Sequence, residues 1–348
     1  MKHEENRPPA WKELMVGEKA PKLQTGKWIQ GEPVPCLESN YVYVVEFWAT
    51  WCGPCVQSIP HLNQLWQEFK DKGVIVVAVD VWDMDDGVAP FAKKMGADMT
   101  YRVALDDKSQ DAEGFMSKNW WPKKVNHHGI PRALVINRDG VIVWIGHPMG
   151  LKEDILGKIV SGHYDLTKAA TDYQKDFESN QKFQDLQSKL FSARHAKQWD
   201  DAEATLKEID SLYPSMTERF ATARLQSLLG QKKFVEAHDF ADSLGKRHAK
   251  DAVWQNILAW TIATSDGPVE PCLGLAETMA QRAVEMTQGT NAASLDTLAR
   301  VQFMLGKELK AVVTQEKAIS VENDERRKAD LEKTLASYRS NKLPDAAY

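Results

Sequence analysis

Cysteine is scarce in this chain, since only 4 of its 348 residues are cysteines. Domains that rely on a disulfide scaffold are short and dense in cysteine, so that architecture is excluded. A basic excess is also missing, because 44 lysines and arginines stand against 49 aspartates and glutamates and the formal net charge is −5. Nucleic-acid binding requires a basic surface that displaces counterions, so we predict no nucleic-acid partner.

Long apolar segments are missing too. The longest uncharged apolar run, Val74–Val79, is far shorter than the about 20 residues of a membrane-spanning helix. The chain starts with charged residues and no apolar run follows them, so we expect no secretory signal. We therefore predict no membrane span and, from the chain as given, a cytoplasmic location. A trimmed signal peptide would instead indicate the periplasm.

The length is sufficient for two domains, at about 150 residues per domain. The composition, with 43% hydrophobic and 27% charged residues, is that of an ordinary globular protein. We expect a tail at 1–14, an α/β domain at 15–163, an α-helical domain at 164–342 and a second tail at 343–348.

In the first half, short apolar runs alternate with segments of helical periodicity. We predict strands at Tyr41–Thr50, Val74–Val81, Thr100–Leu105, Arg132–Asn137 and Val141–Ile145, and helices at Pro60–Lys72, Gly87–Met95, Gln110–Trp120 and Lys152–Val160. The unbroken apolar run from residue 74 is typical of a central strand covered on both faces. Asp139-Gly140 predicts a hairpin between the last two strands. Together these elements indicate an α/β sheet with an antiparallel hairpin at one side.

From about residue 165 onward the strand signal disappears, and short alanine-centred segments recur. Their central residues are Ala202, Ala237, Ala276 and Ala311, at intervals of 35, 39 and 35 residues. A period near 34 residues is typical of tetratricopeptide repeats, which stack into a solenoid with a concave face. We therefore predict an all-α, tetratricopeptide-like repeat domain that binds a protein partner or acts as a scaffold. An unspecialised helical bundle is the alternative.

The most informative segment is Trp51-Cys52-Gly53-Pro54-Cys55. Two thiols separated by two residues can close a small disulfide ring. A predicted strand ends just before them and a helix begins at about Cys52, where exposed N–H groups and the helix dipole lower the pKa of a thiol. A structural zinc site is the alternative, but it needs four ligands, and Cys36 and Cys272 stand alone in the sequence. We predict a redox site and no metal.

The segment Val45-Glu-Phe-Trp-Ala-Thr-Trp-Cys-Gly-Pro-Cys55 resembles the active-site segment of the thioredoxin superfamily, especially that of bacterial disulfide reductases related to TlpA and ResA. Pro60 matches the proline that kinks the active-site helix of that family, and Gly129-Ile130-Pro131 resembles its cis-proline loop. The residues between Val81 and Trp121 match the helix and strand inserted in the TlpA-like branch. The resemblance covers residues 15–163 and implies a thioredoxin-like fold, with a central mixed sheet flanked by helices.

The resemblance also implies catalytic roles. Cys52 attacks a substrate disulfide, and Cys55 resolves the mixed disulfide. Glu46 stands where the family has a buried acid, often Asp. An unpaired ionised carboxylate there costs at least about 3 kcal/mol, so we expect a raised pKa and a role as proton acceptor for Cys55. The alternative is a strand-edge glutamate that faces solvent.

The predicted substrate-binding residues are Trp51, Gly53, Pro54, Ile130, Pro131 and Arg132. We expect a cis peptide bond before Pro131. Arg132 departs from the small residue common in the family, and it either acts on the thiolate or an acidic substrate or lies solvated on the next strand. Trp51 either lines the substrate surface or simply packs, and Trp48 belongs to the core. The paired His127 and His128 are expected to be solvated.

We therefore predict a thiol-disulfide oxidoreductase that reduces protein disulfides. Its redox group is the Cys52–Cys55 disulfide itself, no cofactor is needed, and a separate reductase or small thiol supplies electrons. A thiol peroxidase is one rival, but it would have a Pro–Thr setting upstream of its cysteine, where this chain has Val45 and Ala49. A redox-sensitive adaptor, whose repeats carry the biological role, is the other.

Overall fold

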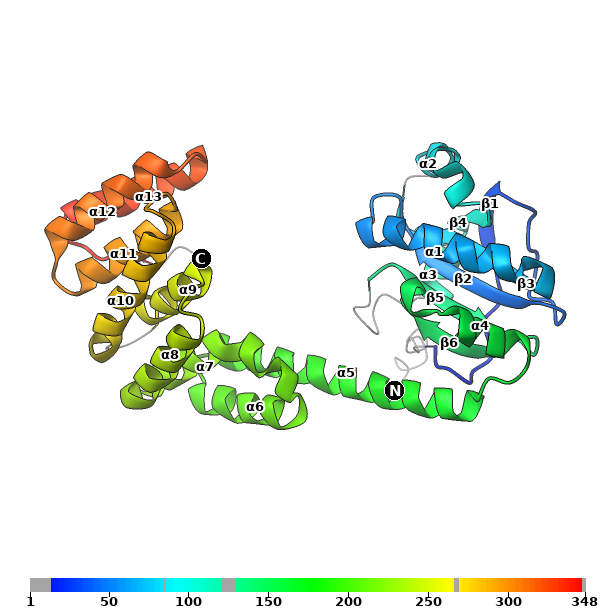
Figure 1. Ribbon diagram of the computed structural model, residues 1–348, viewed down its shortest axis with the longest axis horizontal. Helices are drawn as coiled ribbons and strands as arrows, with labels where there is room; N and C mark the ends of the chain where they lie inside the picture. Colours follow the sequence, from blue (N-terminus) through cyan, green and yellow to red (C-terminus); the bar gives the residue numbers. More distant parts are fainter. Residues whose placement is uncertain (1–13, 84–85, 121–128, 266–268, 346–348) are drawn as a thin grey trace, which may run out of the picture. The chain divides into compact units, whose positions relative to one another are not determined.

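The computed structural model describes residues 14–83, 86–120, 129–265 and 269–345. The chain divides into two compact units, Met1–Gln181 and Lys182–Tyr348 (Figure 1). The division lies within helix α5 (Leu166–His195), later in the chain than the boundary expected at residue 163. The domain limits drawn from the sequence stay a prediction. No helix in the part of the chain that the structure describes combines the length and the apolar character needed to cross a bilayer.

Within its described residues, the first unit is built on one six-stranded sheet with the order β1-β4-β3-β2-β5-β6. The strands are β1 (Thr25–Gln30), β2 (Val42–Trp48), β3 (Val74–Asp80), β4 (Arg102–Asp106), β5 (Arg132–Ile136) and β6 (Ile142–Gly146). Strands β2, β3 and β4 are parallel, whereas β1 at one edge and the β5–β6 hairpin at the other run antiparallel to their neighbours. The predicted mixed sheet with an antiparallel hairpin is confirmed.

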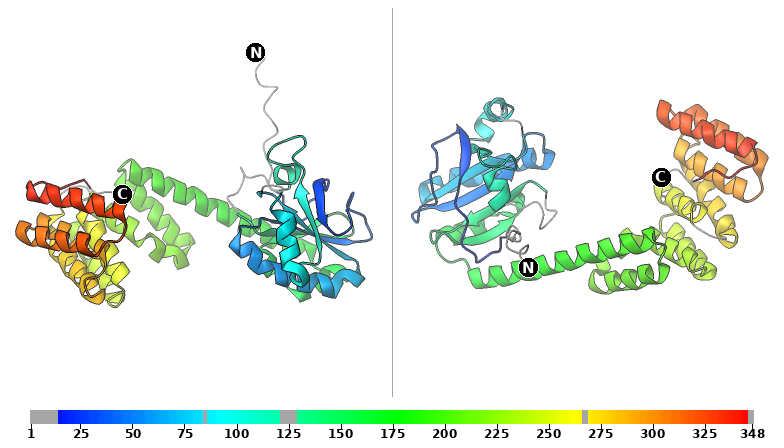
Figure 2. Two further views of the ribbon diagram at one scale, coloured as in Figure 1. Left: turned by 90° about the horizontal axis from the view of Figure 1, so that it is seen from above. Right: turned by 180° about the vertical axis from the view of Figure 1, so that it is seen from behind.

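Helices cover both faces of this sheet (Figures 1 and 2). The helical segments of the first unit before α5 are α1 (Gly53–Phe69), η1 (Lys70–Lys72), α2 (Val88–Met95), η2 (Gly96–Asp98), α3 (Phe115–Asn119), η3 (Pro148–Gly150) and α4 (Glu153–Val160). Apolar side chains of α1, α2 and α4 share one core with the sheet. Those of α3 and the first turns of α5 share a second core with it. Both faces of β2 and β3 are therefore buried, as the unbroken apolar run predicts.

Two elements differ from the prediction. Strand β1 is not predicted by the sequence pattern, and it pairs with β4 through two register shifts. The helix expected at Gln110–Trp120 is wrong in its first half, because α3 begins only at Phe115. Gly114 has a left-handed φ of 92°, and the buried Asp106 carboxylate accepts hydrogen bonds from the N–H groups of Met116 and Ser117 in the first turn of α3. These two features set the start of the helix.

The second unit is entirely helical over its described residues. Besides the end of α5 it contains α6 (Trp199–Leu212), η4 (Pro214–Phe220), α7 (Ala221–Gly230), α8 (Phe234–Arg247), α9 (Ala252–Ala263), α10 (Glu270–Met286), α11 (Ala292–Met304), α12 (Glu308–Val321) and α13 (Glu325–Arg339). Consecutive helices from α9 to α13 lie side by side (Figures 1 and 2). The all-helical fold of this half is confirmed.

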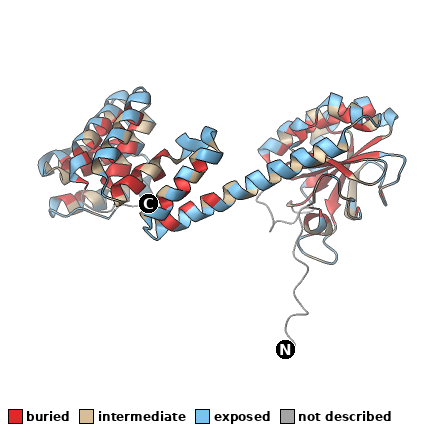
Figure 3. Cartoon of the chain, turned by 90° about the horizontal axis from the view of Figure 1, so that it is seen from below, coloured by how far each residue is buried: buried red, intermediate tan, exposed pale blue. Residues whose placement is uncertain are grey.

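The recurring alanines of the sequence lie where helices pack. Ala202, Ala237, Ala276 and Ala311 fall on α6, α8, α10 and α12, and each is fully buried. Buried residues recur along the helices of this unit (Figure 3). A small side chain at such a position allows two helices to approach closely. This burial explains the period of the sequence pattern, whereas the assignment to the tetratricopeptide family stays a prediction.

Candidate active site

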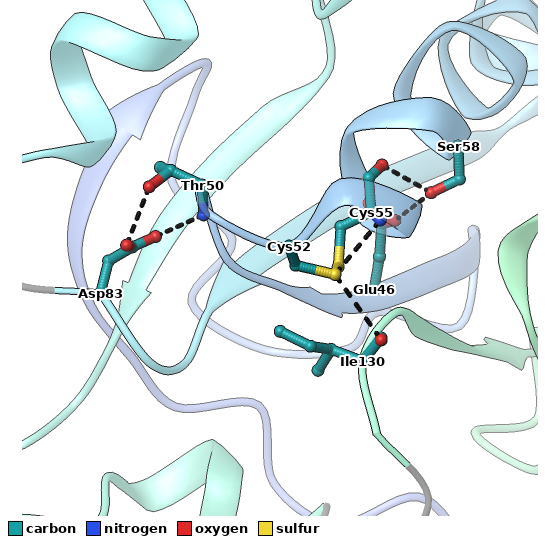
Figure 4. Close-up of a disulfide and its surroundings, with 7 residues drawn as sticks. All are labelled: Glu46, Thr50, Cys52, Cys55, Ser58, Asp83 and Ile130. Atoms are coloured by element: carbon teal, nitrogen blue, oxygen red, sulfur yellow. Dashed lines mark hydrogen bonds between the residues drawn. A yellow bond between two sulfur atoms is a disulfide. The ribbon is translucent and has the colours of Figure 1, made fainter. Parts of the chain in front are cut away.

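The two cysteines lie at the beginning of α1 and form a disulfide (Figure 4). Cys52 is the N-cap residue of the helix, and its Sγ accepts a hydrogen bond from the Cys55 N–H at 3.2 Å. Cys52 is 6% exposed and Cys55 is fully buried. Of these two sulfurs, only that of Cys52 belongs to a side chain with surface that an external disulfide can reach.

The turn that leads into α1 is held by the strand next to it. Strand β2 ends at Trp48, and the following Thr50 donates to the Asp83 carboxylate from its N–H at 2.5 Å and from its Oγ1 at 2.8 Å (Figure 4). Asp83 comes just after β3, which runs parallel to β2. The carboxyl ends of two neighbouring parallel strands thus meet beside Cys52.

A second carboxyl group, that of Asp80, binds the main chain of Asp83. Asp80, the last residue of β3, is buried, and its Oδ1 accepts a hydrogen bond from the Asp83 N–H at 3.0 Å. Burial, and then the neighbouring Asp83, raise the pKa of Asp80 to about 8. Burial alone would raise the pKa of Asp83, but hydrogen bonds from Asp80 and Thr50 outweigh it and lower that pKa. Asp80 is therefore the protonated member of the pair at neutral pH.

The loop before β5 lies against the disulfide. The Ile130–Pro131 peptide bond is cis, as expected. The Ile130 carbonyl oxygen lies 3.6 Å from the Cys52 Sγ (Figure 4). Pro131 is buried and Ile130 is partly exposed, so the chain that carries them forms one border of the accessible sulfur.

Glu46 lies in the middle of the sheet, between Ala78 of β3 and Ala133 of β5. The alternative of a strand-edge glutamate facing solvent is therefore wrong. The side chain is fully buried, and burial raises the pKa of Glu46 to about 8. Within the described residues its Oε2 has no hydrogen-bond partner, whereas Oε1 accepts a long bond of 3.4 Å from the Ser58 Oγ.

Ser58 lies between Glu46 and the main chain of the resolving cysteine. Its Oγ is 2.8 Å from the Cys55 main-chain carbonyl oxygen, so its single hydrogen is shared between this oxygen and the Glu46 carboxylate (Figure 4). No motif in the sequence singles out Ser58. Its position gives the signal that could have found it, because residues three apart on a helix share a face.

Arg132 is neither solvated nor on the α1 face of the sheet. It alternates along β5 with Ala133 and so shares the opposite face with Leu134, in the core below α5. The side chain is buried, and its Nη2 donates to the Tyr173 hydroxyl of α5 at 2.5 Å. A cavity of about 380 Å³ beside it is lined by Pro131, Tyr173 and Phe177 among others. Of the two alternatives for Arg132, the solvated position is wrong, and the action on the thiolate or on an acidic substrate stays a prediction.

Two aromatic side chains stack at this end of the sheet, and one of them, Trp51, directly precedes Cys52 in the sequence. Trp51 is 63% exposed, and its ring stacks on Trp82 with centroids 6.1 Å apart and planes 11° apart. Gly53 and Pro54 are exposed as well, whereas Trp48 belongs to the core as expected. No motif in the sequence singles out Trp82. It follows β3 directly, so its place at the carboxyl end of the strand beside β2 was the available signal.

The remaining candidates lie away from the pair or outside the described residues. Cys36 is an exposed free thiol. Cys272 is buried in α10, and burial raises the pKa of its thiol. His127 and His128 lie outside the described residues. Within the described ranges, no three His, Cys, Asp or Glu side chains gather where they could hold a metal ion.

Comparison with known proteins agrees with this geometry. Residues 15–154 match the family model described as Redoxin. The N-terminal part of the chain is a thioredoxin-like domain of the redoxin family. Its chemistry is that of a thiol-disulfide oxidoreductase. The match does not extend into the helical unit.

The relatives include Protein FixW of Rhizobium leguminosarum, 26% identical over 43% of this chain and 68% of that protein. Thiol-disulfide oxidoreductase ResA of Bacillus anthracis is 28% identical over 37% of this chain and 68% of that protein. Among solved structures, a putative thiol:disulfide interchange protein DsbE from Chlorobium tepidum is 27% identical, with a TM-score of 0.33 over 43% of this chain and 99% of that one.

Proposed function

We propose that this protein reduces disulfides of other proteins by dithiol–disulfide exchange. The observation that carries the proposal is the position of Cys52, whose sulfur is the reachable one of the pair and lies 3.6 Å from the carbonyl of the cis-proline loop. An extended substrate segment that pairs with the backbone of this loop would bring its own disulfide to that sulfur. The exposed Trp51 and the Gly53-Pro54 turn complete the surface that we assign to the substrate.

The first step is an attack by the reduced Cys52. The helix N-terminus and the hydrogen bond from the Cys55 N–H stabilise a negative charge on its sulfur. The thiolate attacks one sulfur of the substrate, the substrate S–S bond breaks, and a mixed disulfide forms. The other substrate sulfur leaves as a thiolate and takes up a proton from solvent.

The second step uses Cys55 and Glu46. In molecules whose Glu46 is ionised, the Cys55 thiol transfers its proton to the Glu46 carboxylate, whose Oε1 accepts a hydrogen bond from the Ser58 hydroxyl. The Cys55 thiolate then attacks the Cys52 sulfur, and the second substrate thiol is released. The pKa of Glu46, at about 8, is near that of an ordinary cysteine thiol, so the proton transfer costs little free energy.

In this exchange the two thiols of Cys52 and Cys55 give two electrons to the substrate and become a disulfide. We propose that this cysteine pair is the redox group and that no further cofactor is needed. A separate thiol or reductase must reduce it again before the next cycle. For the helical unit we propose a tetratricopeptide-like partner-binding role, supported by its sequence period and its buried alanines.

Reduction of insulin disulfides, with dithiothreitol as electron donor, tests the proposal. Cys52→Ser should reduce the rate to the uncatalysed background, since the attacking sulfur is gone. Cys36→Ser is the matched control, because it removes an exposed free thiol and should leave the rate unchanged. Full activity in the Cys52 variant would exclude the proposed function.

Cys55→Ser identifies the substrate directly. Without the resolving thiol, the mixed disulfide at Cys52 should persist and be recovered after electrophoresis without reductant. The double variant Cys52→Ser, Cys55→Ser should capture nothing through this site. Rapid peroxide consumption that depends on Cys52 would instead favour the thiol peroxidase.

A further inference from the structure

A second cavity, of about 290 Å³, lies within the helical unit and apart from the cysteine pair. Side chains of three helices form its walls, namely Asn256 of α9, Asp296 and Arg300 of α11, and Tyr338 of α13. The segment that follows α13 also contributes to the lining, through Pro344 and Asp345.

Arg300 is the central group of this cavity. It is only 7% exposed, and its Nε donates to the Ala263 carbonyl oxygen at 3.1 Å. The guanidinium also lies over the Trp260 ring, 5.7 Å from its centroid. A second donor, Nη1, points to the segment after α13 and donates to the Pro344 carbonyl oxygen at 2.9 Å. These contacts hold the Arg300 side chain in place, and its Nη1 is the group that binds the main chain of the non-helical segment.

The turn at the end of α13 directs this segment toward the arginine. Asn341 has a left-handed φ of 53°, which ends the helix. Its N–H donates to the Tyr338 carbonyl, and the next N–H, of Lys342, donates to the Ser337 carbonyl. These are the two bonds of a Schellman motif, so the direction of Asn341–Asp345 is set by local hydrogen bonds as well as by Arg300.

The cavity also contains polar atoms that this segment does not satisfy. The hydroxyl of the buried Tyr338 and the Oδ1 of Asn256 have no hydrogen-bond partner within the described residues. Asp296 accepts a bond of 2.8 Å from Gln315, and both it and Asp345 interact favourably with the charge of Arg300. Buried polar groups are nearly always paired in folded proteins, so these two atoms indicate that the site accepts further polar atoms from a ligand.

We propose that this cavity is a peptide-binding site and that the segment Asn341–Asp345 is its internal ligand. Arg300 reads a main-chain carbonyl, and its charge selects an acidic residue directly after that carbonyl, as Asp345 follows Pro344. The external ligand is therefore an extended acidic peptide segment of a partner protein, which competes with the chain's own segment. This inference does not depend on the chemistry of the cysteine pair.

Binding in trans tests the proposal with a defined probe. The probe is a fluorescein-labelled synthetic peptide of residues 341–348 (NKLPDAAY), and fluorescence anisotropy measures its binding. A protein that ends at Ser340 should bind it, whereas the full chain should bind it at least tenfold more weakly because its own segment occupies the site. A probe carrying Asp345→Lys should bind the shortened protein at least tenfold more weakly than the original probe.

Two variants separate loss of the site from loss of the fold. In the shortened protein, Arg300→Gln should remove binding, whereas Arg326→Gln, on an exposed position of α13, should not. Arg300 also holds the Ala263 carbonyl, so circular dichroism must show that the variant is folded. In the full chain, Asp345→Lys changes an exposed residue, so it should leave the fold intact and restore binding of the original probe to the level of the shortened protein.

Two results would overturn the proposal. One is a folded shortened protein that does not bind the probe. The other is a folded Arg300→Gln variant that binds it unchanged. If the shortened protein does not fold, the full-length Asp345→Lys protein decides the question, because failure to bind the probe there excludes a displaceable internal ligand.

Discussion

Glu46 makes the stability of the folded protein depend on pH. The folded protein keeps the proton of this buried carboxyl up to about pH 8, whereas the unfolded chain releases it near the usual pKa of a glutamate. Between about pH 5 and pH 8 the folded state therefore binds more protons. In this window the contribution of Glu46 to the free energy of unfolding should fall as pH rises, by at most about 1.4 kcal/mol per pH unit.

Urea unfolding of the oxidised protein at several pH values measures this effect. Glu46→Gln removes the titrating group and keeps the shape, so the variant should gain stability relative to the wild type as pH rises through this window. Asp80 titrates in the same range in both proteins, and its contribution cancels in the difference. Glu68→Gln, at an exposed position of α1, is the control and should show a constant difference. A pH-independent difference for Glu46→Gln would contradict the raised pKa.

Trp51 should affect large substrates more than small ones. A ring that is 63% exposed beside the accessible sulfur offers apolar area to a docked protein, and truncating such an aromatic at an interface typically costs 1–2 kcal/mol or more. Trp51→Ala should therefore raise the KM for a protein disulfide about tenfold and leave the reduction of a small aromatic disulfide nearly unchanged. Met149→Ala, at another exposed apolar residue of this unit, serves as control. Equal losses on both substrates would exclude a docking role.

At the residue scale, the sequence predicts the groups whose chemistry is tied to a motif. The cysteine pair, the buried carboxyl and the cis bond before Pro131 all follow from one strand–turn–helix pattern and one loop. Ser58, Trp82 and Asp83 could not be predicted with the same ease, because they reach the site through the packing of α1 and of the loop after β3. Arg132 illustrates the same limit, since the face to which it points depends on the register of β5.

At the element scale, Arg132 and Tyr173 join β5 to α5. Removing the tyrosine hydroxyl leaves a buried guanidinium without one of its hydrogen bonds, which typically costs about 1–3 kcal/mol. Tyr173→Phe should lower the free energy of unfolding of the first unit by this amount, as measured by urea denaturation. Tyr41→Phe, on an exposed side chain, should have no effect. An unchanged stability of the Tyr173 variant would show that the bond contributes nothing.

The elements that the sequence predicts are those with a strong apolar pattern. β3 is buried on both faces and carries an unbroken apolar run, and the helices of the second unit repeat their alanines. β1 lacks such a pattern, because this half-buried edge strand shifts register twice against β4 and its side chains do not alternate. The short α3 depends on the carboxylate of Asp106, a contact over ten residues that periodicity does not report.

At the scale of the whole molecule, the first unit includes the beginning of α5. Leu166, Ala169, Ala170 and Tyr173 pack against the core of the sheet. A fragment that ends at Gln181 should fold and keep the disulfide-reductase activity. A fragment that ends at residue 163 loses these contacts, and burial of a few such side chains contributes roughly 2–4 kcal/mol.

Urea unfolding monitored by tryptophan fluorescence compares the two fragments. We expect a lower midpoint for the fragment that ends at residue 163. Equal midpoints would show that α5 is dispensable for this unit. From the sequence alone, the change from strands to helices marks where the helical pattern begins, but it does not show that the first of these helices packs on the sheet.

The four cysteines differ in accessibility in a way that provides built-in reporters of folding. In the reduced native protein, an alkylating reagent followed by mass spectrometry should modify Cys36 and Cys52 before the other two cysteines. Cys55 and Cys272 are fully buried, one in each unit. Their modification therefore reports the opening of the sheet core and of the helical core separately, in a single digest and without any introduced label.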